Sequence, residues 1–243
     1  MHPIRLLRPA DIPSCMALKE EAGWNQTEQD WLKLFEFAPD SCFGIEIDGT
    51  LASTITAVCY GTELAWIGMV LTGARFRRRG LASALLEHTL HYLARIPMDW
   101  IKLDATEMGR PVYQRFGFED ECAIERWLRP GTPATFFEEQ SRELGDSFAR
   151  GRPGSKAAYF GPCRATSREA ARDLLEWFLE LHRGEAICWD ILPANVDAVD
   201  LARAHGFTPL RKLVRMALRG RPGAAPRPTD IAHTYATAGF EWG

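Results

Sequence analysis

Arg77-Arg78-Arg79-Gly80-Leu81-Ala82 lies between an apolar stretch, residues 65–72, and an amphipathic stretch, residues 81–93. This order predicts a buried strand, a basic turn and the first turn of a helix. The turn directs several backbone N–H groups to one point, and the first N–H groups of a helix have no partner within it. An anionic diphosphate satisfies both sets of donors, and the arginines add positive charge. The segment therefore predicts a phosphate-binding loop.

The loop carries neither the Walker lysine spacing nor the dinucleotide motif GxGxxG. It reads Arg-x-x-Gly-x-Ala, with Arg77, Gly80 and Ala82 at the three named positions. A second motif follows downstream, Pro111-Val112-Tyr113-Gln114-Arg115-Phe116-Gly117-Phe118. In this order and spacing, the two segments resemble the acyl-CoA pyrophosphate loop and the tyrosine segment of the GNAT N-acetyltransferase superfamily.

The resemblance extends into the C-terminal half. Ala158-Tyr159-Phe160-Gly161-Pro162 and the segment from Asn195 to Gly206-Phe207 resemble the second half of two-domain, YitH-like GNAT proteins. Two prolines and a glycine within residues 129–135 are typical of a linker. We therefore expect a mixed α/β fold with a GNAT domain over residues 1–130, a linker region over 131–145, and a truncated GNAT-like domain over 146–243.

The resemblance also implies acetyl-CoA as cosubstrate and a set of site residues. In this family the fourth strand parts from the fifth, which frees backbone N–H groups for pantetheine and the thioester carbonyl; here these belong to Val70 and Thr72. The family tyrosine that protonates the leaving thiolate corresponds to Tyr113, and a phenol is a suitable donor to a thiolate of similar basicity. The expected coenzyme-binding residues are Val70, Leu71, Thr72, Arg77, Arg78, Arg79, Gly80, Leu81 and Ala82.

The general base is left open by the sequence. The strand position that carries a glutamate in some GNAT members holds Trp66 here. The candidate carboxylates are Glu20, Glu21, Asp30, Glu63, Asp104 and Glu107, and a chain of water molecules is the alternative. Trp24 and Asn25, at the turn between two predicted helices, are candidates for shaping the acceptor pocket.

Composition bounds the remaining possibilities. The 243 residues are 46% hydrophobic and 25% charged, which is typical of a globular chain, and the formal net charge is −3. This balance argues against a nucleic-acid or membrane partner and makes the arginine cluster a local feature. Six cysteines occur without a CxxC pair, the histidines show no ligand spacing, and no signal peptide is evident. We expect reduced thiols, no metal site and a cytoplasmic location.

The sequence predicts further helices, strands and turns outside the loop. Thr27-x-x-Asp30 and Thr166-x-x-Glu169 are capping boxes that open helices, and Asp48-Gly49 predicts a hairpin turn. The C-terminal half reads hairpin, helix, strand, helix, strand, which repeats the second half of the N-terminal domain. Residues 220–228 are rich in proline, glycine and arginine and predict a mobile tail, and residues 231–240 predict an edge strand.

The resemblance to GNAT proteins, together with these features, implies an N-acetyltransferase that moves the acetyl group of acetyl-CoA to a primary amine of a small molecule. The C-terminal repeat enters its helix through Cys163-Arg164-Ala165-Thr166, without a glycine loop, which indicates one coenzyme site per chain. A non-catalytic acyl-CoA-binding regulatory module is the alternative, and a nucleic-acid patch is the third reading of the arginines. The sequence leaves open whether the C-terminal unit closes the acceptor site or forms an interface, and whether the protein is a homodimer.

Overall fold

The protein is described here by a computed structural model that covers residues 2–243. Its N-terminal half begins with a strand and two helices, continues through three antiparallel strands, and ends in alternating helices and strands. The elements are β1 (Ile4–Leu6), α1 (Ile12–Glu21), α2 (Glu28–Phe37), β2 (Cys42–Ile47), β3 (Thr50–Tyr60), β4 (Leu64–Thr72), α3 (Leu81–Leu93), β5 (Trp100–Thr106), α4 (Arg110–Gln114) and β6 (Glu119–Arg129). Short 3-10 helices cover Pro9–Asp11 and Ala74–Phe76.

The C-terminal half repeats this order from the equivalent of β2 onward. Its elements are β7 (Gln140–Leu144), β8 (Ser147–Arg152), β9 (Ala158–Arg164), α5 (Arg168–Leu181), β10 (Ile187–Ile191), α6 (Val196–Ala204), β11 (Thr208–Arg219) and β12 (Thr234–Ala236). Strands β9 and β10 pair in parallel, as β4 and β5 do. Between residues 140 and 219 the structure contains no counterpart of β1, α1 and α2. The prediction of a mixed α/β fold with a truncated second GNAT-like unit is confirmed.

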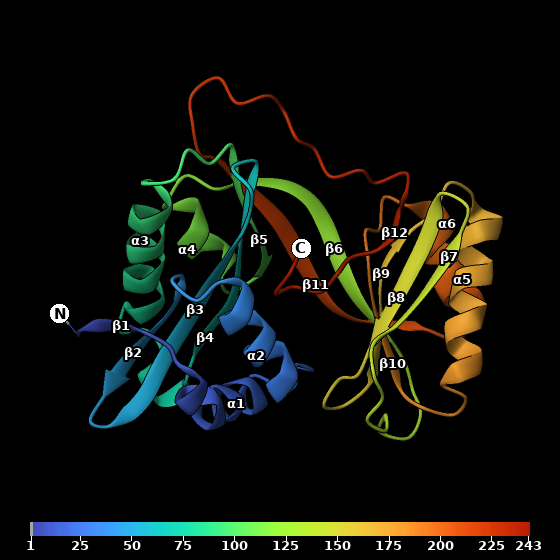
Figure 1. Cartoon of the computed structure of the whole chain (residues 1–243), viewed down its shortest axis with the longest axis horizontal. Coiled ribbons are helices and arrows are strands. Elements are labelled where there is room, and N and C mark those ends of the chain that lie inside the picture. The colour runs from blue at the N-terminus through green and yellow to red at the C-terminus, as the bar shows by residue number, and fades with distance from the viewer. Residues whose placement is uncertain (1) are drawn as a thin grey trace.

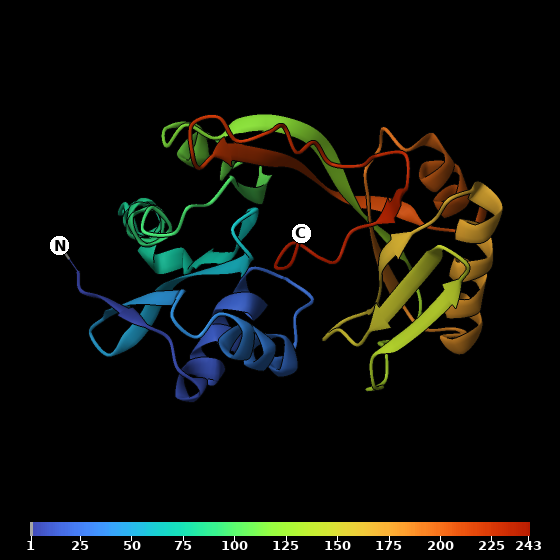
Figure 2. The same ribbon diagram turned by 45° about the horizontal axis from the view of Figure 1, so that its top comes forward.

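One continuous sheet joins the two halves, in the order β1-β2-β3-β4-β5-β11-β6-β10-β9-β8-β7, with β12 beside β9. The halves exchange their last strands. Strand β11, from the C-terminal half, pairs with β5, and β6, from the N-terminal half, pairs with β10. β6 and β11 also pair with each other, and Figure 2 shows both strands arching from one half to the other. Each half therefore completes the sheet of the other.

Helices cover both faces of the N-terminal sheet (Figure 1). The leucine stripe of α3 packs on one face, as its spacing predicts, against buried strand residues that include Ile45, Ile55, Ile67 and Leu103. Helices α1 and α2 cover the other face through Leu18, Trp31 and Leu34. In the C-terminal half, α5 and α6 cover one face through Leu174, Phe178 and Ala202.

The uncovered face of the C-terminal half packs against the N-terminal half through buried ion pairs. Arg152 of β8 donates to Asp30 at 3.0 Å and to Glu241 near the C-terminal end. Asn25 donates to the carbonyl of Ala157 at 2.8 Å. The turn between α1 and α2, together with the first turn of α2, therefore lies against this face.

Strands β4 and β5 separate after a short pairing. Only Leu64–Trp66 pair with Trp100–Lys102, although both strands continue. Beyond the pairing, β4 contains a β-bulge, since its register with β3 shifts between Thr54 and Thr56 and Met69 takes a φ of +47°. A bulge bends a strand and increases its twist. The bend opens a gap in the sheet at the carboxyl ends of β4 and β5.

Three local predictions differ from the structure. Strand β7 lies in residues 131–145, where the sequence predicts a linker region. Helix α5 begins after Ser167, whose hydroxyl accepts a hydrogen bond from the Ala170 N–H, whereas the sequence predicts Thr166 as the capping residue. Residues 220–228 are held against β5, with their carbonyls accepting hydrogen bonds from Trp100 and Lys102.

Candidate active site

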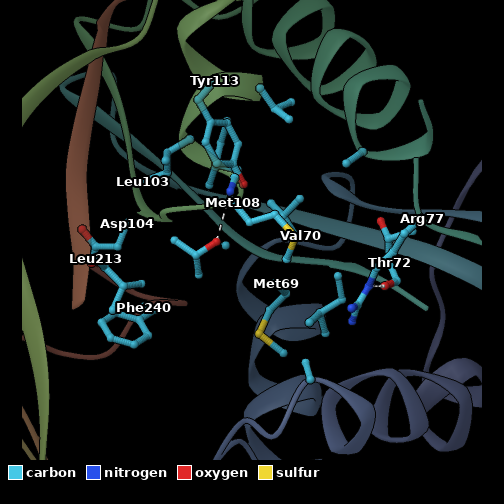
Figure 3. Close-up of a pocket in the computed structure, with 18 of the residues that line it drawn as sticks. Met69, Val70, Thr72, Arg77, Leu103, Asp104, Met108, Tyr113, Leu213 and Phe240 are labelled. Atoms are coloured by element: carbon cyan, nitrogen blue, oxygen red, sulfur yellow. Dashed lines mark hydrogen bonds between the residues drawn. The ribbon is translucent and has the colours of Figure 1, made fainter. Parts of the chain in front are cut away.

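A cavity of about 1160 Å³ occupies the gap between β4 and β5. It extends from the N-terminus of α3, past the separated strands, to β11 and the C-terminal segment (Figure 3). Most residues that the sequence assigns to the site line it: Val70, Leu71, Thr72, Arg77, Arg78, Gly80, Leu81, Ala82 and Tyr113. Arg79 lies outside the lining, with its guanidinium 5.8 Å from the ring centroid of Phe76.

The loop before α3 presents unpartnered backbone donors to one end of the cavity. The Ala84 N–H is the first to bond within the helix, to the Gly80 carbonyl at 3.0 Å, so the preceding N–H groups of α3 have no helical acceptor. Arg78 and Gly80 both adopt positive φ angles, +59° and +78°. A Cβ on Gly80 would meet no protein atom within 4 Å. The loop is thus an open, cationic cradle for an anion.

The separated part of β4 also carries free backbone donors. The Gly73 N–H donates to the Ala52 carbonyl at 3.0 Å, which turns the polar groups of Thr72 away from β3. The Thr72 carbonyl accepts a hydrogen bond from Arg77 Nε at 3.2 Å on that side. The Thr72 N–H therefore points to the gap, where β4 no longer pairs with β5. Val70 follows the bulge residue Met69 and also lines the cavity.

Tyr113 reaches the cavity from the short helix α4 (Figure 3). Its ring is 8% exposed and packs edge-on against Phe118, with centroids 6.1 Å apart. Burial raises the pKa of Tyr113 above its ordinary value. The phenol is therefore protonated at neutral pH and can act as a proton donor.

Of the candidate carboxylates, Glu21, Asp104 and Glu107 line the cavity. Arg215 of β11 donates to both oxygens of Asp104, at 2.9 and 3.0 Å, so Asp104 is half of a buried ion pair. Burial raises the pKa of Asp104, and the arginine opposes that shift. Glu21 accepts a hydrogen bond from the Ala74 N–H at 2.6 Å, and Glu107 is exposed.

The other proposed carboxylates lie outside the lining. Glu20 pairs with Lys156 on the surface, Glu63 pairs with Arg227, and Asp30 pairs with Arg152 between the halves. Trp24 lines the cavity. Asn25 does not, because its amide binds the backbone of residues 156 and 157 in the C-terminal half.

The C-terminal half contributes residues to this cavity, in line with one of the two roles that the sequence leaves open for it, although no sequence pattern predicts which residues these are. Strand β11 brings Arg211, Lys212 and Leu213 to it, and the segment after β12 brings Phe240. The Phe240 carbonyl accepts a hydrogen bond from Trp66 Nε1 at 2.9 Å, so Trp66 anchors this segment. No local signal in residues 208–219 marks the strand exchange that delivers β11.

Two family models match the chain. Acetyltransferase (GNAT) family matches residues 11–118, and Acetyltransferase (GNAT) domain matches residues 113–232. The chain belongs to the GNAT acetyltransferase family. It consists of two GNAT-like units, and its membership identifies it as an acyltransferase that uses acyl-CoA. No curated protein matches the sequence.

Solved structures share the fold of this GNAT protein at low sequence identity. A putative acetyltransferase from Pyrococcus horikoshii is 18% identical, with a TM-score of 0.80 over 99% of this chain and 95% of that chain. A GCN5-related N-acetyltransferase from Sphaerobacter thermophilus is 14% identical, with a TM-score of 0.67 over 93% and 98%. A tandem GNAT protein from the clavulanic acid biosynthesis pathway is 14% identical, with a TM-score of 0.63 over 92% and 100%.

Within residues 2–243, no helix has both the length and the apolar character needed to cross a membrane.

Proposed function

We propose that this GNAT protein is an N-acetyltransferase that moves the acetyl group of acetyl-CoA to the primary amine of a small molecule. The observation that carries the proposal is one cavity that holds three functional parts: an anion cradle at α3, free N–H groups on β4, and a buried phenol on α4. Side chains from both halves form the wall at the far end of the cavity, which favours a compact acceptor over an extended polypeptide.

The cradle fits a coenzyme diphosphate. The space where a Cβ of Gly80 would stand is free of protein atoms, so a phosphate oxygen can approach the backbone there. Arg77, Arg78, Leu81 and Ala82 line the same cavity, so their guanidinium and backbone N–H groups would hold the diphosphate. Coenzyme A supplies the activated thioester, and the loop fixes its diphosphate relative to β4.

The residues beyond the cradle would serve the transfer itself. As the amine nitrogen bonds to the thioester carbon, the N–H groups of Val70 and Thr72 would stabilise the negative carbonyl oxygen, at about 3–4 kcal/mol for one well-placed donor. The C–S bond then breaks, and Tyr113 would donate its proton to the thiolate. The proton that the amine loses would pass to Glu107, Glu21 or water, and proton return to Tyr113 restores the site.

The test combines binding with turnover. Acetyl-CoA and longer acyl-CoA thioesters are titrated against the protein by calorimetry, and free thiol is measured with a panel of primary amines. We expect tight binding of acetyl-CoA and amine-dependent thiol release with an acetylated amine as product. Binding without turnover on any amine would instead identify a non-catalytic acyl-CoA-binding module.

A further inference from the structure

Arg211 occupies an unusual position at the far end of the cavity. It lies near the start of β11, opposite Arg126 of β6, and its side chain is half-buried in the cavity lining. Leu213, two residues further along β11, lies beside Asp104 and Phe240 on the opposite side of the cavity from Thr72 and Arg77 (Figure 3). The C-terminal half thus delivers a cation to the end of the cavity opposite the diphosphate cradle.

Other buried arginines near this cation have carboxylate partners. Arg126 donates to both oxygens of Asp190, at 2.7 and 2.6 Å, and Arg152 pairs with Asp30 and Glu241. Arg215, four residues along the same strand, holds Asp104.

Arg211 alone in this group lacks such a partner. Over residues 2–243 its guanidinium makes no hydrogen bond or ion pair with any side chain. The charged groups that act on it are Arg126, which repels it, and Asp190, whose oxygens are already taken by Arg126 and Tyr159. Burial, together with the neighbouring Arg126, lowers the pKa of Arg211. A half-buried guanidinium that lines a cavity and has no carboxylate partner is stabilised when an anion binds beside it.

We propose that Arg211 binds a carboxylate on the acceptor, so that the substrate is an amine that also carries a carboxylate group, as amino acids do. The proposal rests on the proposed acyl transfer for the identity of the acceptor. The planar guanidinium presents paired N–H donors that match the two oxygens of a carboxylate. The diphosphate has its own cradle at α3, so the coenzyme leaves this cation free.

The cavity restricts where the amine of such an acceptor lies. With its carboxylate at Arg211, the rest of the molecule extends along β11 past Leu213 toward the gap between β4 and β5. Val70 and Thr72, whose N–H groups the proposed transfer uses, border that gap. Arg211 is accordingly a specificity-determining residue that orients the amine, and the chemical step does not require it.

The first experiment measures turnover on matched acceptors. The panel contains proteinogenic amino acids, longer amino carboxylates, the carboxamide of each, and aminoalkyl phosphonates. For the wild type we expect carboxylates to exceed their carboxamides in kcat/KM. In Arg211→Gln we expect kcat/KM for carboxylates to fall on the order of 10- to 100-fold, mainly through KM, with carboxamides nearly unchanged. Arg211→Lys should restore part of the preference.

Arg219→Gln is the matched control, because Arg219 is an exposed arginine on the same strand that lies over Trp100, away from the cavity. It removes the same charge and should leave the preference intact. A carboxylate preference that survives in Arg211→Gln, or a stronger preference for phosphonates or carboxamides in the wild type, would overturn the assignment while leaving acyl transfer standing.

A binding measurement separates this site from the proposed function. N-acetylated amino acids and their carboxamides are titrated by calorimetry into the coenzyme-A-loaded wild type and Arg211→Gln. Carboxylate binding that depends on Arg211, without turnover of any amine, would refute the acetyltransferase proposal and keep the carboxylate site. Equal binding of carboxylates and carboxamides by the wild type would refute the site whatever the turnover.

Discussion

Gly80→Asp is the substitution that tests the diphosphate cradle most directly. Gly80 has a φ of +78°, and a side chain at this position would meet no protein atom within 4 Å. The cost to the fold is therefore only the left-handed backbone conformation, about 1 kcal/mol for a residue with a Cβ. For a chain of this size that corresponds to a fall in Tm of about 2–4 °C.

The cost to coenzyme binding is much larger. An aspartate at this position places a negative charge in the space where the diphosphate would bind. At a separation of about 4 Å and an effective dielectric constant of about 20, one pair of like charges costs about 4 kcal/mol. This corresponds to a loss of affinity of about 1000-fold. Gly80→Ala, which adds bulk without charge, should lose less.

The assay is calorimetric titration with acetyl-CoA, together with a thermal unfolding scan. Gly206→Asp is the matched control, because Gly206 has a φ of +80° at the end of α6, and a side chain there also meets open space. It should lower the Tm equally and leave the affinity unchanged. An unchanged affinity in Gly80→Asp would refute the cradle, and a large loss in both variants would show that the effect is on the fold.

Three further outcomes are expected. Tyr113→Phe should lower kcat for amine acetylation more than it changes KM, as stopped assays would show, and equal turnover would remove the phenol as the acid. Asp104→Ala should lower the free energy of unfolding by about 3–5 kcal/mol in urea, because it leaves the Arg215 charge buried and unpaired; a near-neutral effect would contradict that arrangement. The hydrogen bonds from Arg5 lower the pKa of Asp11, so Asp11→Asn should destabilise the protein by about 1 kcal/mol at neutral pH. The carboxylate contributes this stability above about pH 4 and loses it as the pH falls through the lower folded pKa, so the two proteins should converge in acid and a constant difference would count against the ion pair.

Local patterns were sufficient to predict the loop and helix at the α3 end of the cavity. The basic turn, the glycine at its end and the leucine stripe of α3 are encoded within a few residues of one another, so their arrangement follows from backbone geometry. The capping box at Thr27 is confirmed for the same reason, since its hydrogen bonds join residues only three apart; Asp30 additionally accepts from Arg152, which the sequence does not predict.

The acceptor end of the cavity could not be predicted from local patterns, because it is formed by contacts between segments that are distant in the sequence. In the sequence, Arg211 is an ordinary basic residue of a predicted strand. Only the pairing of β11 with β5 and β6 places it in the cavity. The sequence likewise does not predict the ion pair between Asp104 and Arg215, because it depends on the same strand pairing. The opening between β4 and β5 follows from the bulge at Met69, and no residue type in this strand predicts a bulge there.

The exchange of β6 and β11 has a consequence for biosynthesis. Strand β5 is bordered on one side by β11, which the ribosome makes more than a hundred residues later. While the chain is growing, the N-terminal half carries an open sheet edge that can pair with a neighbouring strand. Its cavity acquires a closed wall only after translation has passed Arg219. The protein should therefore gain its activity late in synthesis, and nascent chains that stall before β11 are the ones that need protection from aggregation.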